Sequence, residues 1–319
     1  MPLRNATTLA LICALWVSFS AFPAGDWSDS GITGPSYSKI LSEMKRWHET
    51  YPGLTELVDF GKSVRGLPLR MMIARKPGRF SDRPTLILSG STHGDEYLHL
   101  EDRLPEALLQ QSRQTGSIQR FFDRGGAFVF IPIMNPDGYE ARTRENAEGV
   151  DLNRDWDWDL APAGFKGFTQ IESQALRRQL ERMELPPYRL HYQISVDYHC
   201  CAGALLYPWA YQAKHIPEAD FSRHLAIAQM ASELLNIDYG ATGEVLGYFP
   251  LGTTKDYYYD HYGMLAFTYE GRYGVEDSYF SKHLEWWKKM VGYLNQEQLA
   301  TFFPLFPERS HHAFSKLAD

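Results

Sequence analysis

His93 and Glu96 stand three residues apart in the stretch Ser89-Gly-Ser-Thr-His-Gly-Asp-Glu-Tyr97, directly after an apolar segment. An imidazole nitrogen and a carboxylate oxygen at this spacing can chelate one Zn²⁺ ion. Because a catalytic zinc site needs a third protein ligand and one open position for water, the pair predicts a histidine elsewhere in the chain. Alone, the His-x-x-Glu pattern is a weak signal that a solvated loop also explains.

The residues before this pair have the pattern of a buried strand. Residues 84–90 (PTLILSG) are short, apolar and β-branched, as in a parallel strand with both faces covered. Their glycine-rich exit indicates a strand-to-loop edge, where α/β enzymes hold their sites. Other predicted strands span 54–60, 67–74, 127–134, 190–198, 204–208 and 264–269, and predicted helices span 37–51, 98–111, 221–235 and 279–294, with one more running from the capping box Thr169-x-x-Glu172 to Met183.

This alternation of strands and helices predicts an α/β fold with a mixed, mostly parallel central β-sheet flanked by helices. Residues 61–66 are rich in turn formers, so the two segments they join are expected to form a hairpin. The chain has 319 residues, 44% of them hydrophobic, which is enough for one large core. Because no linker-like composition interrupts it, we expect a single catalytic domain over residues 25–319.

The charge of the chain limits the class of partner. The formal net charge is −7 and no cluster of Lys and Arg is visible. Because binding to phosphates requires clustered basic residues, this composition argues against nucleic acid as a partner.

The first residues resemble an export signal. A short positive head ends at Arg4, and the apolar segment 6–19 is too short, and too polar at its end, for a membrane span. Small residues up to Ala24 offer cleavage points. We therefore predict a signal peptide over residues 1–24 and a secreted or periplasmic protein, with an uncleaved anchor as the alternative. Cys13 lacks the small residue that precedes a lipoprotein cysteine, so lipid attachment is not expected.

Beyond this segment the chain has two cysteines, Cys200 and Cys201, which are adjacent. They could form a strained vicinal disulfide or remain two small buried thiols. In either case no disulfide framework holds the fold, so its core must do so.

Further polar residues follow or end the later predicted strands. With His93 and Glu96, they make the chain resemble the zinc carboxypeptidases of the carboxypeptidase A type, the M14 peptidases. The resemblance runs from the helix at 37–51 to Phe-Thr-Tyr-Glu270, and the order of its motifs is too specific for chance. The motifs are His93-x-x-Glu96, Asn135-Pro-Asp-Gly-Tyr139, Gly149-Val-Asp-Leu-Asn-Arg154, His199, Tyr248 and Glu270.

The resemblance implies the roles of the metal ligands and of the base. His93, Glu96 and His199 would hold one Zn²⁺ per chain, with water in the open position, although nitrogen and oxygen ligands alone would also admit other first-row metals. Glu270 matches the general base, which takes the water proton and returns it to the departing amine. Asp151 matches the carboxylate that orients His93.

The resemblance also implies how substrate is held. Arg144 matches the arginine that stabilises the tetrahedral oxyanion, while Arg142 is better explained as a surface charge. Asn153 and Arg154 match the pair that grips the free C-terminal carboxylate, for which the planar fork of Arg is suited. Tyr248 matches the mobile tyrosine that closes over the same carboxylate.

Two positions depart from the family pattern. By the resemblance, Lys255 stands at the position that lines the base of the family's side-chain pocket, where a cation would favour an acidic terminal side chain or the extra carboxylate of diaminopimelate. The alternative is that its flexible stem turns the charge out to water. Asp95 stands where some members of the family carry an arginine that helps bind the substrate upstream of the cut. It either favours a cationic or at least non-acidic group there or stabilises its own loop.

Other polar and aromatic residues have simpler explanations. The stretch from Asp155 to Asp159 could be a sugar-binding platform, but a packed loop is the better interpretation, and Tyr257, Tyr258 and Tyr259 are expected in the core and at its rim. One zinc needs three ligands, so the remaining histidines are expected on the surface or in the core: His99, His191, His215, His224 and His261.

The leading hypothesis is an exported, monomeric zinc carboxypeptidase acting on peptides, or on cell-wall peptides with a free C-terminal carboxylate. Alternatives are a murein-peptide γ-D-glutamyl-diaminopimelate amidase and a zinc-dependent N-acyl amino acid deacylase. A catalytically dead binding module would expect the loss of Glu270 or of a zinc ligand, and all are present. Little room precedes the family-like region for a long inhibitory propeptide, so we expect an enzyme that is active as exported.

Overall fold

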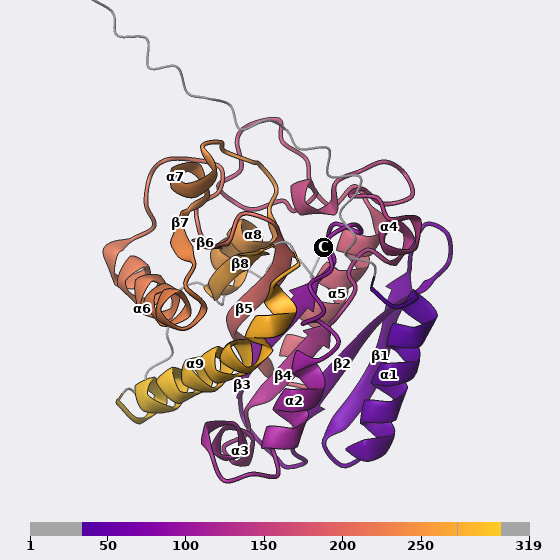
Figure 1. Cartoon of the computed structure of the whole chain (residues 1–319), viewed down its shortest axis with the longest axis vertical. Coiled ribbons are helices and arrows are strands. Elements are labelled where there is room, and N and C mark those ends of the chain that lie inside the picture. The colour runs from indigo at the N-terminus through magenta and orange to yellow at the C-terminus, as the bar shows by residue number, and fades with distance from the viewer. Residues whose placement is uncertain (1–33, 273, 301–319) are drawn as a thin grey trace, which may run out of the picture. The chain divides into compact units, whose positions relative to one another are not determined.

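A mixed eight-stranded β-sheet is the frame of the protein in the computed structural model, which describes residues 34–272 and 274–300 (Figure 1). The described residues belong to one compact unit. The strands lie side by side in the order β1-β2-β4-β3-β5-β8-β6-β7. Their bounds are β1 (Thr55–Lys62), β2 (Pro68–Arg75), β3 (Arg83–Gly90), β4 (Ala127–Ile131), β5 (Leu190–Cys200), β6 (Ala204–Tyr207), β7 (Asp238–Ala241) and β8 (Leu265–Gly271).

The centre of the sheet is parallel. Strands β4, β3, β5 and β8 run in the same direction, whereas the β1–β2 hairpin and strand β6 join the sheet antiparallel. This confirms the predicted α/β class with a mixed sheet and the predicted hairpin. Because parallel strands end at the same edge, the loops that leave β3, β5 and β8 meet there.

Helices cover both faces of the sheet (Figure 1). Side chains alternate along β3, so that Leu86 and Leu88 enter one buried cluster and Ile87 enters another. Helices α1, α2, α3, α6 and α9 contribute to the first cluster, and α5 and α8 to the second. Helix bounds are α1 (Tyr37–Thr50), α2 (Leu104–Gln111), α3 (Ser117–Asp123), α4 (Pro136–Ala141), α5 (Ile171–Glu184), α6 (Glu218–Leu235), α7 (Thr242–Leu246), α8 (Thr254–Tyr262) and α9 (Phe280–Ala300), with short 3₁₀ helices η2 (Leu152–Arg154) and η3 (Glu276–Tyr279).

Two details of the predicted helices are wrong. The helix expected from residue 98 begins at Leu104, because the side chain of Glu101 accepts the backbone N–H groups of Leu98 and Leu100 and so replaces helical bonding there. The capping box before α5 does not form. Thr169 instead donates its hydroxyl to Asp155, and the helix begins after Gln170 without a side-chain cap.

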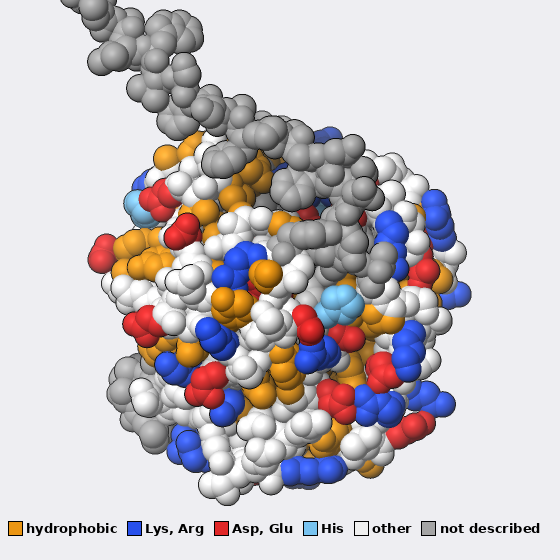
Figure 2. Space-filling model, viewed as in Figure 1, with side chains coloured by type: hydrophobic (Ala, Val, Ile, Leu, Met, Phe, Trp, Pro, Cys, Tyr) orange, Lys and Arg blue, Asp and Glu red, His pale blue; other side chains and the backbone are white. Residues whose placement is uncertain are grey.

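The predicted signal peptide, residues 1–24, lies outside the described residues. Within the described part of the chain, no helix combines the length and the apolar composition that a membrane span requires. On the face shown in Figure 2, basic and acidic side chains are interspersed, and no continuous basic patch is visible on that face.

Candidate metal centre and active site

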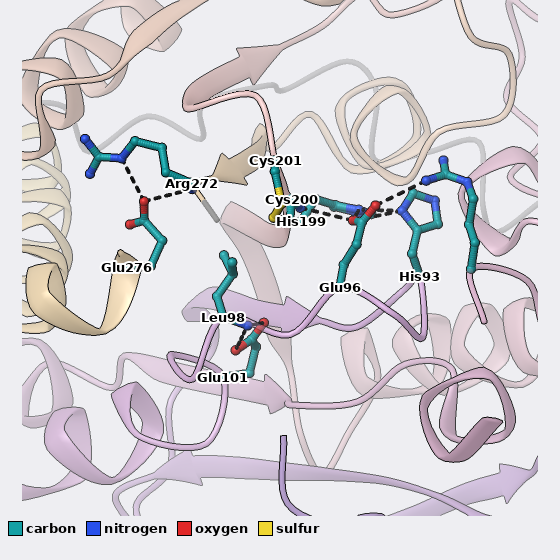
Figure 3. The surroundings of a disulfide bond; sticks show 10 residues. His93, Glu96, Leu98, Glu101, His199, Cys200, Cys201, Arg272 and Glu276 are labelled. Carbon is teal, nitrogen blue, oxygen red and sulfur yellow. Dashed lines mark hydrogen bonds and ion pairs between the residues drawn. A yellow bond between two sulfur atoms is a disulfide. The ribbon is translucent and has the colours of Figure 1, made fainter. Parts of the chain in front are cut away.

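His93, Glu96 and His199 meet at the edge of the sheet where β3 and β5 end. The Nδ1 atoms of the two imidazoles lie 3.0 Å apart, and Glu96 Oε2 lies 2.9 Å from each of them. Figure 3 shows the three side chains pointing toward one another. Among the described residues this is the one group of His, Cys, Asp or Glu side chains with the geometry to hold a metal ion.

The outer nitrogen of each imidazole is bonded to a carboxylate. His93 Nε2 lies 3.0 Å from Asp151 Oδ1, and His199 Nε2 lies 2.9 Å from Asp197 Oδ2. Since a carboxylate accepts, each Nε2 carries the proton and each Nδ1 presents a lone pair. Two lone pairs and a carboxylate oxygen therefore converge on one point, an arrangement that a cation satisfies. Two nitrogen ligands and one oxygen ligand fit Zn²⁺ with a position left open.

The electrostatics of this cluster agree with that fit. Burial lowers the pKa of His199, but the carboxylates of Asp197 and Glu96 outweigh burial and raise the pKa well above its usual range. Burial raises the pKa of Glu96, but the two histidines hold it well below its usual value. The cluster as a whole attracts positive charge.

Asp197 is a residue of the site that sequence reasoning missed. It accepts hydrogen bonds from Ser89 Oγ at 2.9 Å, Thr92 Oγ1 at 3.0 Å and Thr254 Oγ1 at 3.0 Å, besides the bond from His199. The available signal was its place two residues before His199 on a strand, which puts both side chains on one face.

Glu270 lies beside the metal cluster. It is the register partner of His199 on the neighbouring parallel strand β8. Adjacent strands are about 4.8 Å apart and paired side chains share a face, so this carboxylate is next to the ligands. Burial and then Glu96 raise the pKa of Glu270, while His199, His93 and Lys255 oppose that shift.

Arg144 also reaches the cluster. Its Nη1 donates to Glu96 Oε1 at 3.1 Å and its Nε donates to Asp151 Oδ2 at 3.0 Å. Arg142 instead donates to the Gly34 carbonyl and lies over the Tyr139 ring, away from the metal ligands. This placement agrees with the interpretation of Arg142 as a charge outside the site.

The residues predicted to grip substrate lie around the same edge. Asn153 is buried, and its Oδ1 accepts the backbone N–H of Thr254 at 2.9 Å where helix α8 begins. Arg154 donates from Nη1 to the Asn153 carbonyl at 2.8 Å. Tyr248, after α7, is 48% exposed. The tyrosine therefore lies at the solvent-exposed rim.

Lys255 is buried in the first turn of α8, with 3% of its surface exposed. Its neighbour Asp256 is turned away and accepts the backbone N–H of Ala210 at 2.9 Å. Burial lowers the pKa of Lys255, while the charges of Asp256 and Glu270 raise it and that of Arg154 lowers it. The stem does not carry the charge out to water, so that alternative is wrong.

The remaining residues fall outside the metal cluster. Trp156 and Trp158 are buried, which confirms a packed loop rather than a sugar platform. Cys200 and Cys201 are joined as a disulfide beside the ligands and are only partly buried (Figure 3). The backbone N–H of Cys200 donates to Glu96 Oε2 at 3.1 Å. Tyr257, Tyr258 and Tyr259 are buried, as predicted; His191 and His215 lie near the surface against Asp82 and Glu244, and His224 is in the core.

Comparison with known proteins places this geometry in a family. Carboxypeptidase SOL1 of Arabidopsis thaliana is 33% identical over 116 residues, which cover 35% of this chain and 23% of that protein. The inactive metallocarboxypeptidase ECM14 of Arthroderma benhamiae is 25% identical over 209 residues, covering 57% of this chain and 35% of that protein. The matched segments thus span less than half of either relative.

The crystal structure of thrombin activatable fibrinolysis inhibitor superposes with a TM-score of 0.69 at 19% identity, covering 81% of this chain and 73% of that one. Similarity at this identity shows a shared fold. The profile of the Peptidase_M14 family, described as zinc carboxypeptidase, matches residues 40–285, which include every candidate site residue discussed above. The chain therefore belongs to the zinc carboxypeptidase family.

Proposed function

We propose that this chain is an exported zinc carboxypeptidase that hydrolyses the C-terminal amide bond of peptides. Because one relative is named as inactive, membership of the family does not by itself imply catalysis. The observation that carries the proposal is the pairing of His199 with Glu270 on adjacent parallel strands. It sets a carboxylate that can accept a proton beside a three-ligand metal cluster.

Bound zinc would supply a Lewis acid that polarises the scissile carbonyl and makes water more acidic. Glu270 takes a proton from the attacking water at a carboxylate oxygen and later gives a proton to the departing amine. Arg144 places a fixed cation near the developing oxyanion; one such donor contributes about 3 kcal/mol in other enzymes.

The substrate's terminal carboxylate would be held by Asn153 and Arg154. The guanidinium fork matches two carboxylate oxygens, and Asn153 is fixed in place by its bond to Thr254. Tyr248, exposed at the rim, would close over the same carboxylate. This clamp requires a free C-terminus and so makes the enzyme an exopeptidase. The match to the zinc carboxypeptidase family over residues 40–285 counts against the N-acyl amino acid deacylase.

We further propose that Lys255 selects an acidic terminal side chain. The residue is buried, and no ion pair of its ammonium is found among the described residues, although the charges of Asp256 and Glu270 act on it. A buried cation without such a partner is costly, and a substrate carboxylate would neutralise it. Diaminopimelate carries a second carboxylate that could do the same. This favours a cell-wall peptide cut at the γ-D-glutamyl-diaminopimelate bond as the second candidate function.

The experiment measures release of the terminal residue from peptides ending in Glu, Lys, Phe or diaminopimelate. We expect wild type to favour Glu over Lys by about 10- to 100-fold in kcat/KM, the value of one charge-assisted hydrogen bond. Lys255→Asp should reverse that order. Lys255→Met, the matched neutral control, should abolish the preference while still cleaving the Phe peptide. An unchanged Glu-to-Lys ratio in both variants would contradict the assignment.

Export rests on residues 1–24 and has its own test. Protein recovered from outside the cytoplasm should begin shortly after Ser20 or Ala24 in N-terminal sequencing. Intact Met1 on exported protein would favour the uncleaved anchor.

A further inference from the structure

Glu276 is a buried carboxylate that the chemistry above does not use. It lies in η3 with 2% of its surface exposed. Its Oε2 accepts from Tyr269 Oη at 2.7 Å and lies 2.9 Å from His283 Nε2. Its Oε1 accepts from both the backbone N and the Nε of Arg272, each at 2.9 Å (Figure 3). All four groups bond one carboxylate.

These partners lie on both sides of Glu270 in the sequence. Tyr269 precedes it on β8, and Arg272 follows it by two residues, just beyond the end of that strand. Glu276 therefore holds the end of β8 before and after Glu270. Burial raises the pKa of Glu276, but the bonds from His283, Arg272 and Tyr269 hold the pKa at about 2, so the group stays ionised at neutral pH.

A second buried carboxylate, Glu101, holds the loop that carries two metal ligands. It accepts the backbone N–H groups of Leu98 at 3.1 Å and Leu100 at 3.0 Å. It also packs against the end of β3, where a Cβ on Gly90 would lie 2.4 Å from Glu101 Cγ. Its bonds thus fix the backbone that follows Glu96.

The two loops are in direct contact. A Cβ on Gly271, the residue after Glu270, would lie 2.5 Å from Leu98 Cδ1 and 3.1 Å from Glu276 Cγ. Arg103 forms an ion pair with Asp277, and its guanidinium carbon lies 4.3 Å from the ring centroid of Phe280. The segment after β8 is thereby packed on the loop that follows His93 and Glu96.

We propose that Glu276 is a positioning residue for the proposed base: it fixes the end of β8 so that Glu270 keeps its place against the metal ligands. This inference rests on the proposed function. A displacement of about 1 Å can cost about 100-fold in rate, so a group that only holds backbone can control turnover. Glu276 acts on Glu270 through Tyr269, Arg272 and Gly271 rather than on substrate.

The test compares Glu276→Ala with Glu276→Gln in the zinc-loaded full chain. We expect kcat to fall by about 10- to 100-fold in Glu276→Ala, with KM within about twofold of wild type and zinc content unchanged. Glu276→Gln should recover a large part of kcat, because its amide oxygen can still accept from Arg272 and its amide N–H can reach Tyr269. Backbone amides over residues 265–272 should exchange hydrogen faster in Glu276→Ala.

The matched control is Asp220→Asn. Asp220 is a buried carboxylate on α6 that accepts from Tyr259 Oη at 2.6 Å, and its loss should lower stability without lowering kcat. The proposal is overturned if Glu276→Ala keeps kcat within twofold of wild type, or if Asp220→Asn loses as much kcat at equal loss of stability. If Glu276→Ala does not fold, Tyr269→Phe serves instead, because it removes only the hydroxyl that donates to Glu276. An unchanged kcat in Tyr269→Phe would also overturn the proposal.

Failure of the proposed function would give a different result from failure of the positioning role. Wild type would then release no terminal residue, and hydrogen exchange would decide the role of Glu276 alone. Faster exchange over residues 265–272 in Glu276→Ala supports positioning, and unchanged exchange rejects it.

Discussion

Two pairs of acidic side chains support the metal cluster and the loops around it, and they act on different parts of it. Asp151 and Asp197 bond the outer nitrogens of the two histidine ligands. Glu101 and Glu276 bond backbone N–H groups of the loops that leave β3 and β8. The first pair orients ligand side chains, and the second sets where the loops lie. We therefore expect affinity for the metal to depend mainly on the first pair and positioning of the proposed base mainly on Glu276.

The largest effect that separates the pairs should come from Asp197. We expect Asp197→Asn to weaken zinc binding by about 10- to 100-fold, as removal of a carboxylate behind a histidine ligand does in other zinc sites. Neutralising it also makes His199 a poorer donor to the metal. Competition with a chromophoric zinc chelator measures the change. Equal zinc affinity in the variant and wild type would contradict the role of Asp197 in supporting the ligand His199.

Glu101 supplies the control for that experiment. Glu101→Ala leaves two buried backbone N–H groups without partners, which costs about 1–3 kcal/mol each in the free energy of unfolding. Its effect on zinc affinity should be smaller than that of Asp197→Asn, because both imidazoles keep their carboxylates. If Glu101→Ala weakened zinc binding as much as Asp197→Asn, the residues that hold the loop backbone and those that orient the ligand side chains would not have separate effects on zinc affinity.

A smaller effect concerns the first residues of β8, which are held by the neutral imidazole of His224. His224 Nδ1 donates to the Asp220 carbonyl, and its Nε2 accepts the backbone N–H of Ala266. Burial lowers the pKa of His224 to about 4 from 6.5. The unfolded chain therefore binds more protons than the folded chain between these values, so stability falls as pH falls through that range.

The contribution of this histidine should amount to about 1 kcal/mol between pH 6.5 and 5.5. We expect His224→Gln to lose that much less stability than wild type over the same interval, in urea unfolding at fixed zinc concentration. Parallel losses in the two proteins would show that His224 does not titrate as its burial requires.

The fold and the metal cluster could be predicted from the sequence more fully than the carboxylates that support them. Strand β3 and the hairpin follow from apolar runs and turn residues, which are local features, whereas the set His93, Glu96 and His199 follows from the family resemblance. Asp197 was missed because the partners that explain a buried Asp in an apolar strand, Ser89, Thr92 and Thr254, come from distant parts of the chain.

The loop-holding carboxylates were missed for the same physical reason. Residues 98–111 have helical spacing throughout, yet Glu101 takes two backbone N–H groups and delays the helix to Leu104. Glu276 stands in the polar stretch Val275-Glu-Asp-Ser278, which has the composition of an exposed turn. Tertiary partners determine both burials, and composition does not reveal them.

We propose that Glu270 works beside the metal cluster as the base of a carboxypeptidase. The most direct measurement is release of terminal glutamate by wild type and Glu270→Gln, with zinc content determined on the same samples and with a chelator arm. We predict equal zinc content, abolition of wild-type release by the chelator, and a kcat lowered by about 10²- to 10⁴-fold in the variant. Release by zinc-loaded Glu270→Gln at the wild-type rate, or wild-type release that survives complete removal of zinc, would contradict the account.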